Sequence, residues 1–303
     1  MKWKSEIMTK LIASIIVATK NRPDRIGMML DALLMQKISD AFEIIICNDG
    51  STDNTKEIIE GYAKKFKKIT VINLPKSKGP ATARNKGIFK AKGKYIVIMD
   101  DDCVAGNNWL KDLLNPFKTD KKLGIVSSFG PFGGTSTAYL TEIVKKEKGF
   151  DEAFPAQYRE DSDLVFRIED GGFKTLFLQD GTAKFQHLHR QPQGFINKLI
   201  YGWKRIFIHD VDPLIYKKHP ERVKKMLDVK LGFIRNPLED FKVATGMWKG
   251  SKVSELGSPQ GVTLIKNKSP LHFLIIILLG LSYVLLVKMA RLSGSIKYGK
   301  LLI

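Results

Sequence analysis

The chain has 303 residues, of which 44% are hydrophobic and 27% are charged. This length and composition exclude an intrinsically disordered chain and allow one large domain with an appendage, or two modest domains. A formal net charge of +19 favours an anionic partner, but it does not choose among nucleic acid, an anionic membrane surface and a phosphate-bearing substrate.

The two cysteines, Cys47 and Cys103, lie beside apolar runs and are interpreted as free thiols in a reducing compartment. The first ten residues are too polar for a signal peptide, and the apolar run at 11–18 is too short to span a bilayer. The sequence therefore predicts that the main body of the protein stays in the cytoplasm.

The first third of the chain alternates short apolar runs with amphipathic segments. The runs predict strands at 12–18, 42–47, 69–74 and 95–99, with helices at 24–36, 54–66 and 81–91 between them. Near-continuous apolar runs are typical of strands covered on both faces. The pattern therefore predicts a mainly parallel, Rossmann-like α/β sheet flanked by helices. Such sheets bind ligands at the carboxyl ends of their strands.

The pattern is looser after residue 102. We expect a loop at 124–134, helices at 137–148 and 161–170, and a strand at 173–178. The chain is basic from 187 to 268 and uncharged from 271 to 287. The uncharged run is near the lower length limit for a spanning helix and has basic residues at both ends. It predicts a C-terminal membrane helix, with a buried core helix as the alternative.

These boundaries predict three regions: a catalytic domain at 1–190, a basic and mostly helical extension at 191–268, and a C-terminal helical membrane appendage at 269–303. The extension and the membrane helix together favour an acceptor that is associated with a membrane.

Three adjacent carboxylates, Asp100, Asp101 and Asp102, follow the predicted strand at 95–99. At the end of a buried strand they repel one another and lose solvation, and a divalent cation removes that cost. Alternate residues of an extended segment point the same way, so Asp100 and Asp102 can share a ligand. Carboxylate oxygens suit Mg²⁺ or Mn²⁺. The alternative is an acidic turn that caps the next helix.

Polar residues also follow the first two predicted strands. Thr19, Asn21 and Arg22 come after the first, where they can equally mark an ordinary helix start. Asp49 follows the second, where a carboxylate can accept hydrogen bonds from a base or a ribose, although an Asp-Gly turn explains it equally well.

Charged residues on two predicted helices complete the set of candidates. Arg84 lies on the first turns of the helix at 81–91, where it can pair with a diphosphate or face solvent. Glu160 and Asp161 begin the helix near 161–170, where the helix dipole stabilises negative charge without any further role for the acids. Beside a metal site, however, a carboxylate there can deprotonate an acceptor hydroxyl.

Together these segments resemble the family 2 glycosyltransferases of the GT-A fold. The matching segments occur in the family's order, at 15–22, 43–55, 79–87, 94–102, 149–152 and 160–171. Each match alone is weak to moderate, but the ordered set is specific. It departs from the family pattern at Asn48, where an acid is commoner, and at Thr135, which follows the glycine pair in place of an asparagine.

The resemblance implies a donor site built from several loops. It places Thr19, Asn21 and Asp49 around the nucleoside and Arg84 near the diphosphate, with Arg22 as a further substrate-binding residue. It implies that Asp100 contacts the nucleotide-sugar, with Asp101 in support.

The resemblance further implies a metal ligand and a general base. Asp102 matches the metal-binding acid, and Asp161, beside Glu160, matches the base. His187 or His189 fits a histidine that completes the metal shell, with His187 favoured and an ordinary surface histidine as the alternative.

The expected function is inverting transfer of a sugar from a UDP-, GDP- or dTDP-sugar to the hydroxyl of a glycan or lipid-linked acceptor. The expected cofactor is Mg²⁺ or Mn²⁺, and the expected location is the cell membrane, with the catalytic domain facing the cytoplasm. Nucleic acid is not an expected partner. The alternatives are a nucleotidyltransferase, or a membrane-tethered protein that binds nucleotide-sugars or nucleic acid without catalysis.

Overall fold

The computed structural model of the protein describes residues 11–155, 158–178, 181–188, 197, 200–201, 206–227, 229–234 and 270–303. The chain divides into two compact units, Met1–His189 and Arg190–Ile303. The domain limits predicted at 190 and 268 stay predictions.

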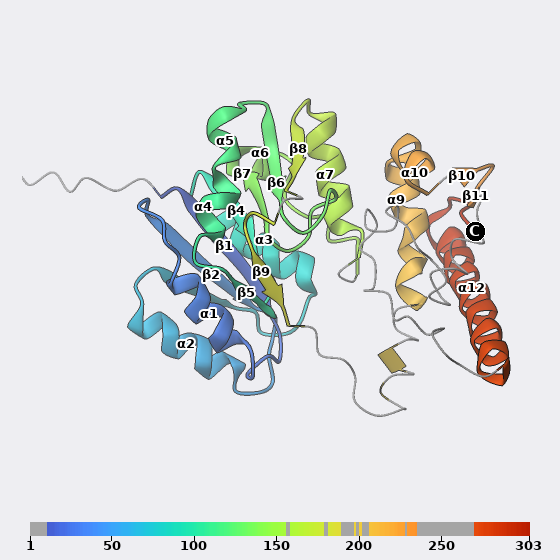
Figure 1. Cartoon of the computed structure of the whole chain (residues 1–303), viewed down its shortest axis with the longest axis horizontal. Coiled ribbons are helices and arrows are strands. Elements are labelled where there is room, and N and C mark those ends of the chain that lie inside the picture. The colour runs from blue at the N-terminus through green and yellow to red at the C-terminus, as the bar shows by residue number, and fades with distance from the viewer. Residues whose placement is uncertain are drawn as a thin grey trace, which may run out of the picture. The chain divides into compact units, whose positions relative to one another are not determined.

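The first unit is built on a seven-stranded sheet with the strand order β3-β2-β1-β4-β7-β6-β8 (Figure 1). Its strands are β1 (Ala13–Thr19), β2 (Phe42–Asn48), β3 (Ile69–Asn73), β4 (Tyr95–Ile98), β6 (Leu123–Ser127), β7 (Thr137–Leu140) and β8 (Lys174–Phe177). Only β7 runs against its neighbours β4 and β6, and every other pairing in this sheet is parallel. The prediction of a mainly parallel sheet is confirmed.

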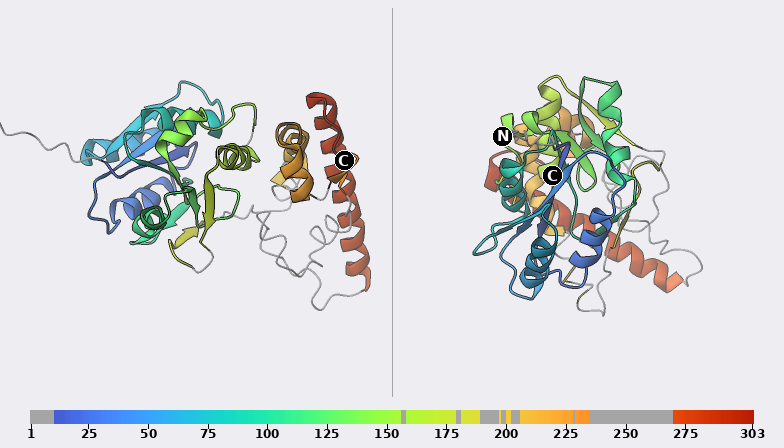
Figure 2. Two further views of the ribbon diagram at one scale, coloured as in Figure 1. Left: turned by 90° about the horizontal axis from the view of Figure 1, so that it is seen from above. Right: turned by 90° about the vertical axis from the view of Figure 1, so that its left-hand side faces the viewer.

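Helices cover both faces of the sheet (Figures 1 and 2). One face carries α1 (Ile26–Leu34), α2 (Thr55–Lys65), α4 (Trp109–Leu114) and α5 (Pro116–Thr119); the other carries α3 (Pro80–Lys90), α6 (Thr141–Lys146) and α7 (Glu160–Asp170). Side chains alternate along β1, because Ile15 joins the core beneath α1 while Ile16 lies against Gly87 of α3. This two-sided burial explains the continuous apolar run of the strand.

Two expectations downstream of the acid cluster were wrong. Residues 137–140 form β7 and not the start of a helix, and α6 begins only at residue 141. β7 pairs with β4 on one side and with β6 on the other, and this pairing outweighs the helical pattern of the local sequence. The expected loop at 124–134 also contains most of β6. Gly124 is part of this strand, and close packing explains the glycine, because a Cβ atom there would come within 2.7 Å of the Cβ of Phe173.

A small two-stranded sheet completes the first unit. β5 (Cys103–Ala105) pairs antiparallel with β9 (Phe185–His187), so that Cys103 lies opposite His187. The sequence pattern did not predict either strand, because each has only three residues. Their pairing brings the end of the first unit back to the acid cluster.

The described part of the second unit is mostly helical. It consists of the 3₁₀ turn η1 (Ile208–Val211), α9 (Asp212–Lys218), α10 (Pro220–Leu227), the short strands β10 (Val229–Lys230) and β11 (Phe233–Ile234), and α12 (Pro270–Tyr298). A buried ion pair joins Arg291 of α12 to Asp212 of α9, with Nε and Oδ2 3.1 Å apart. The same carboxylate oxygen lies 3.0 Å from the Nδ1 of His209.

The uncharged run at 271–287 lies inside α12. Within the described parts of the chain, no helix meets the length and hydropathy that crossing a membrane requires. The predicted membrane helix is therefore not confirmed. The helix continues past the uncharged run to Tyr298, and Arg291, four residues beyond that run, is buried against α9.

Candidate functional site

The acid cluster lies immediately beyond β4, at the carboxyl end of the parallel strands, where ligands of such sheets bind. The backbone N–H of Asp100 donates to the Thr135 hydroxyl at 2.9 Å, and the carbonyl of Asp102 accepts from the N–H of Leu188 at 2.7 Å. Both carboxylates remain partly exposed, with 20% and 15% of the side-chain surface accessible. The segment is therefore held by its backbone while its side chains stay available to a ligand.

Asp102 and His187 form a close polar pair in the cluster. The register of β5 and β9 places the Nε2 of His187 2.9 Å from the Oδ1 of Asp102. This hydrogen bond raises the pKa of His187, against the opposing effect of its partial burial. Arg25 is buried, and its Nη1 lies 3.9 Å from the Oδ2 of Asp102. The same nitrogen donates a hydrogen bond to the Leu188 carbonyl.

Asp101 is more enclosed than its two neighbours. Burial raises the pKa of its carboxyl to about 6, and the nearby Thr19 hydroxyl and Arg22 guanidinium only partly offset this. The Nε of Arg22 lies 3.5 Å from the Oδ1 of Asp101. Asp101 therefore connects the cluster to the loop after β1.

The donor set at Asp102 and His187 fits a hard divalent cation. Their facing oxygen and nitrogen atoms are 2.9 Å apart, about the separation of two adjacent ligands in an octahedral shell with bonds of about 2.0–2.1 Å. The Cys103 sulfur lies in the same group of atoms, all within 4.8 Å of one another. Burial raises the pKa of that thiol far above its usual value, and sulfur is a soft ligand, so Cys103 does not suit Mg²⁺ or Mn²⁺.

The side chain of Arg84 is buried among carboxylates and does not face solvent. Its guanidinium lies 2.8 Å from Asp100, 3.1 Å from Glu160 and 3.8 Å from Asp161. Burial alone lowers the pKa of Arg84, but the three acids outweigh burial and raise it well above its usual value. The nearby ring of Phe150 lies 5.5 Å from the guanidinium carbon. Arg84 thus joins the acid cluster to the start of α7.

Glu160 and Asp161 occupy different environments at that helix start. Glu160 is fully buried against Arg84, whereas 23% of the Asp161 side chain is exposed. Burial raises the pKa of both carboxyls, and Arg84 works in the opposite direction on both. Of the two acids, Asp161 is the one with a surface on which an acceptor hydroxyl can lie.

The loops after β1 and β2 are linked by side-chain hydrogen bonds. The side-chain amide oxygen of Asn21 accepts a hydrogen bond from the backbone N–H of Thr52 at 2.9 Å. Asp49 is buried, and its carboxylate accepts from the Ser77 hydroxyl and from the N–H groups of Lys78 and Gly79 at 2.6–3.1 Å. The structure thus places Asp49 as the anchor of the loop that leads into α3.

Three residues that hold the site were not predicted as site residues. Arg25 contacts Asp102 and has no local sequence signal, whereas Thr135, noted only as a departure from the family pattern, accepts a hydrogen bond from the backbone of Asp100. Asn48, which departs from the family pattern, hydrogen-bonds to Asn73 at 2.9 Å and accepts from the N–H of Ser51 at 3.0 Å. It therefore connects two strand ends, and this use suits an amide. His189, the second candidate histidine, lies outside the described residues.

The mostly parallel seven-stranded sheet flanked by helices matches the GT-A fold. A family model described as glycosyl transferase family 2 matches residues 14–169, more than half of the chain. The chain belongs to glycosyl transferase family 2, and the resemblance stated from its sequence is confirmed.

Curated relatives agree with this membership. The chain is 26% identical over 277 residues to the glycosyltransferase GlyG of Streptococcus pneumoniae, covering 78% of this chain and 89% of that protein. It is 35% identical over 105 residues to TuaG of Bacillus subtilis, a putative teichuronic acid biosynthesis glycosyltransferase, covering 35% and 40%. Seven curated relatives, TuaG among them, are matched over less than half of their own length.

The fold resembles that of the mannosyltransferase PcManGT from Pyrobaculum calidifontis, solved in complex with GDP-Man and Mn²⁺. The TM-score is 0.63 at 17% identity, and the likeness covers 92% of this chain and 86% of that one. At this identity the likeness establishes the common fold.

Proposed function

We propose that this protein is a metal-dependent, inverting glycosyltransferase that moves a sugar from a nucleoside-diphosphate sugar to an acceptor hydroxyl. The observation that carries the proposal is the continuous arrangement Asp102–His187, Asp100–Arg84 and Arg84–Asp161 at the carboxyl edge of the sheet. It offers a cation site on one side and a partly exposed base on the other. Family membership supports the same reaction class.

In this proposal Asp102 and His187 hold Mg²⁺ or Mn²⁺, and Asp100 faces the donor. When bound, the cation supplies positive charge that stabilises the nucleoside diphosphate leaving group. Asp161 accepts the proton of the acceptor hydroxyl as that oxygen attacks the anomeric carbon. Arg84 keeps the Asp161 carboxyl ionised, and the loops that carry Thr19, Asn21, Arg22 and Asp49 enclose the nucleoside.

The role of Asp161 is tested by Asp161→Asn, which keeps the shape of the side chain but removes the base. We expect release of nucleoside diphosphate from a matched donor and acceptor to fall by about 10²–10⁴-fold, with donor binding retained. Asp170→Asn, at the exposed far end of the same helix, is the matched control. Full turnover by Asp161→Asn contradicts the assignment, and release of pyrophosphate would indicate nucleotidyl transfer instead.

The metal site is tested by direct Mn²⁺ binding, followed by electron paramagnetic resonance. Asp102→Asn and His187→Ala should each weaken Mn²⁺ binding clearly, whereas Asp170→Asn should not. If both variants bind Mn²⁺ as the parent protein does, the cation is held elsewhere.

We further propose that the protein works at the cell membrane, on a lipid-linked or cell-envelope glycan, with the catalytic domain facing the cytoplasm. Seven large apolar side chains of α12 are exposed at spacings of three and four residues, which is one helix face: Leu274, Leu278, Leu281, Leu285, Met289, Leu292 and Ile296. Such a face can lie in a membrane interface. The resemblance to TuaG supports an envelope acceptor.

Membrane attachment is tested with the double variant Leu278→Glu, Leu285→Glu. We expect it to leave the membrane fraction of the expressing cells, because two charges on the apolar face oppose burial in lipid. Leu231→Glu changes an exposed leucine outside that face and should stay with the membranes. Equal retention of both variants contradicts this proposal.

A further inference from the structure

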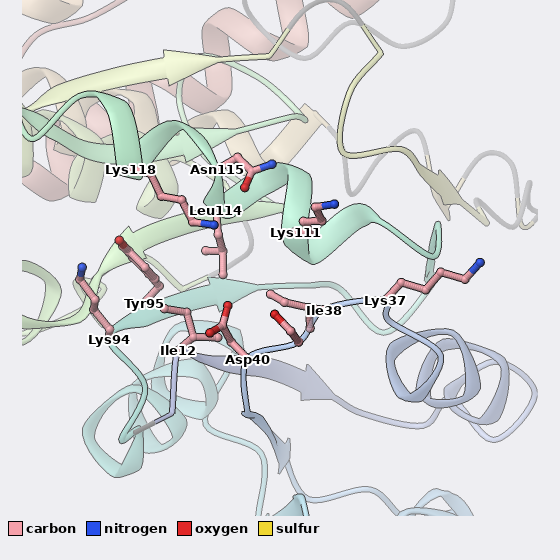
Figure 3. Close-up of a pocket in the computed structure, with 11 residues that line it drawn as sticks. Ile12, Lys37, Ile38, Asp40, Lys94, Tyr95, Lys111, Leu114, Asn115 and Lys118 are labelled. Carbon is pink, nitrogen blue, oxygen red and sulfur yellow. The ribbon is translucent and has the colours of Figure 1, made fainter. Parts of the chain in front are cut away.

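A basic pocket lies at the opposite edge of the sheet from the acidic candidate active site. A pocket of about 370 Å³ opens where β1 and β4 begin (Figure 3). Four lysines, Lys37, Lys94, Lys111 and Lys118, line it together with a single acid, Asp40. We call this feature the lysine pocket. The strand β1 separates the two edges by about 23 Å, since its seven residues rise about 3.3 Å each.

The walls of the lysine pocket are held by backbone and core contacts. The Gln36 amide donates to the Gly106 carbonyl at 2.9 Å and accepts from the N–H of Leu110 at 2.9 Å, which ties the loop before β2 to α4. The ring of Tyr95 packs on Phe117 with centroids 4.6 Å apart. The pocket is therefore formed before any ligand arrives, and this lowers the entropic cost of binding.

The ammonium groups of the lysine pocket have no ion-pair partner among the described residues. None of the salt bridges in that part of the chain involves the four lysines or Asp40, and all five residues are exposed. Lys94 and Lys118 lie toward one end of the pocket, Lys37 and Lys111 lie toward the other, and Asp40 lies between them (Figure 3). The pocket thus carries excess positive charge, which a bound anion would neutralise.

We propose that the lysine pocket binds a phosphate group, as a second ligand site separate from the donor site. A phosphate carries enough charge to interact with several ammonium groups, and lysine binds it as a point charge. The buried side chains of Tyr95 and Leu114 also line the pocket, so it can accept an apolar part beside the phosphate. The phosphate can belong to a free small molecule or to a lipid headgroup.

The test uses the full chain in EDTA, which removes divalent cations from the acidic donor site. Pyrophosphate is titrated calorimetrically, and vesicles of zwitterionic lipid with and without phosphatidylglycerol are sedimented with the protein. The double variant Lys94→Glu, Lys118→Glu should weaken the binding of at least one of these probes by about tenfold or more, because two attractions become repulsions. The control Lys64→Glu, Lys65→Glu makes the same change in net charge at the exposed end of α2.

The outcomes separate the two sources of phosphate. A loss confined to pyrophosphate indicates a soluble ligand, and a loss confined to phosphatidylglycerol vesicles indicates a lipid headgroup. Equal losses in the control pair would show that net charge alone drives binding, and unchanged binding in the pocket variant would exclude the site; either result overturns the proposal. The neutral pair Lys94→Gln, Lys118→Gln replaces the charge-reversal variant if the reversed charges disturb folding. It should weaken the binding of the same probe, but by a smaller factor.

Discussion

The buried guanidinium of Arg84 contacts Asp100 on one side and both acids of the α7 start on the other. A buried charge of this kind is tolerated only with partners, and removal of one partner leaves the others uncompensated. At the scale of single residues, Arg84 therefore serves two purposes. It balances the charge of the acid cluster, and it favours the ionised form of Asp161.

The first prediction concerns stability. Arg84→Met should lower the free energy of unfolding by about 3–5 kcal/mol, because Glu160 would be left buried without its cation. The double variant Arg84→Met, Glu160→Leu should recover much of that loss in urea unfolding, since an apolar pair replaces a buried ion pair. An additive loss in the double variant would show that the two side chains do not act as a pair.

The second prediction concerns pH. Burial raises the pKa of Asp161, so the base is protonated, and sugar transfer is lost, as pH falls through a value above the usual 3.8. Arg84 lowers this pKa, so its replacement by Met should raise the pKa further and move the acidic limb of the kcat profile to higher pH. The pH–rate profiles of the two proteins check this, and Arg22→Met, which contacts Asp101 instead, provides the control.

At the scale of elements, the site depends on how closely α3 approaches the sheet. Gly87 makes this approach possible, because a Cβ atom there would come within 2.7 Å of the Ile16 side chain and 2.9 Å of the Cys47 sulfur. Arg84 lies less than one turn earlier on the same helix. Any change that lifts α3 from the sheet therefore also displaces the guanidinium from its three carboxylates.

The third prediction follows from that packing. Gly87→Ala should destabilise the protein by about 1–3 kcal/mol, as overpacking of a filled core does, and should lower kcat by displacing Arg84. Gly61→Ala on α2 has open space around it and should instead stabilise the helix by roughly 0.5–1 kcal/mol. Thermal unfolding and turnover of both variants test the contrast. A neutral Gly87→Ala would mean that α3 can shift without consequence.

At the scale of the whole molecule, the second unit contains a buried ion pair between α12 and α9. Asp212 is fully buried and contacts Arg291 and His209, so the last part of α12 is attached to α9 by charge as well as by packing. An exposed pair nearby, Lys297 with Asp210 at 3.7 Å, is far more open to solvent. Buried and exposed pairs of this kind differ strongly in what their removal costs.

The fourth prediction uses that difference. Arg291→Met should speed amide hydrogen exchange over residues 288–298 of α12, because it removes the guanidinium that contacts the buried Asp212 carboxylate. Lys297→Met should change exchange there only slightly, since exposed pairs contribute about 0–1 kcal/mol. Similar exchange in both variants would contradict a special role for the buried pair. Exchange in β1 and β2 of the first unit serves as the internal reference.

The sequence alone determined the elements whose signals are local. Apolar runs covered on both faces located β1 to β4. The acids and loops that follow these strands located the candidate site, because parallel strands place their carboxyl ends at one edge of the sheet. Tertiary structure decided what depends on distant partners. β7 formed because two strands required a neighbour, and the pairing of β5 with β9 placed His187 beside Asp102. Arg84 turned inward because three carboxylates, one of them 76 residues away, enclose its charge. Such long-range contacts leave no periodic signal in a sequence, so only the folded chain shows them.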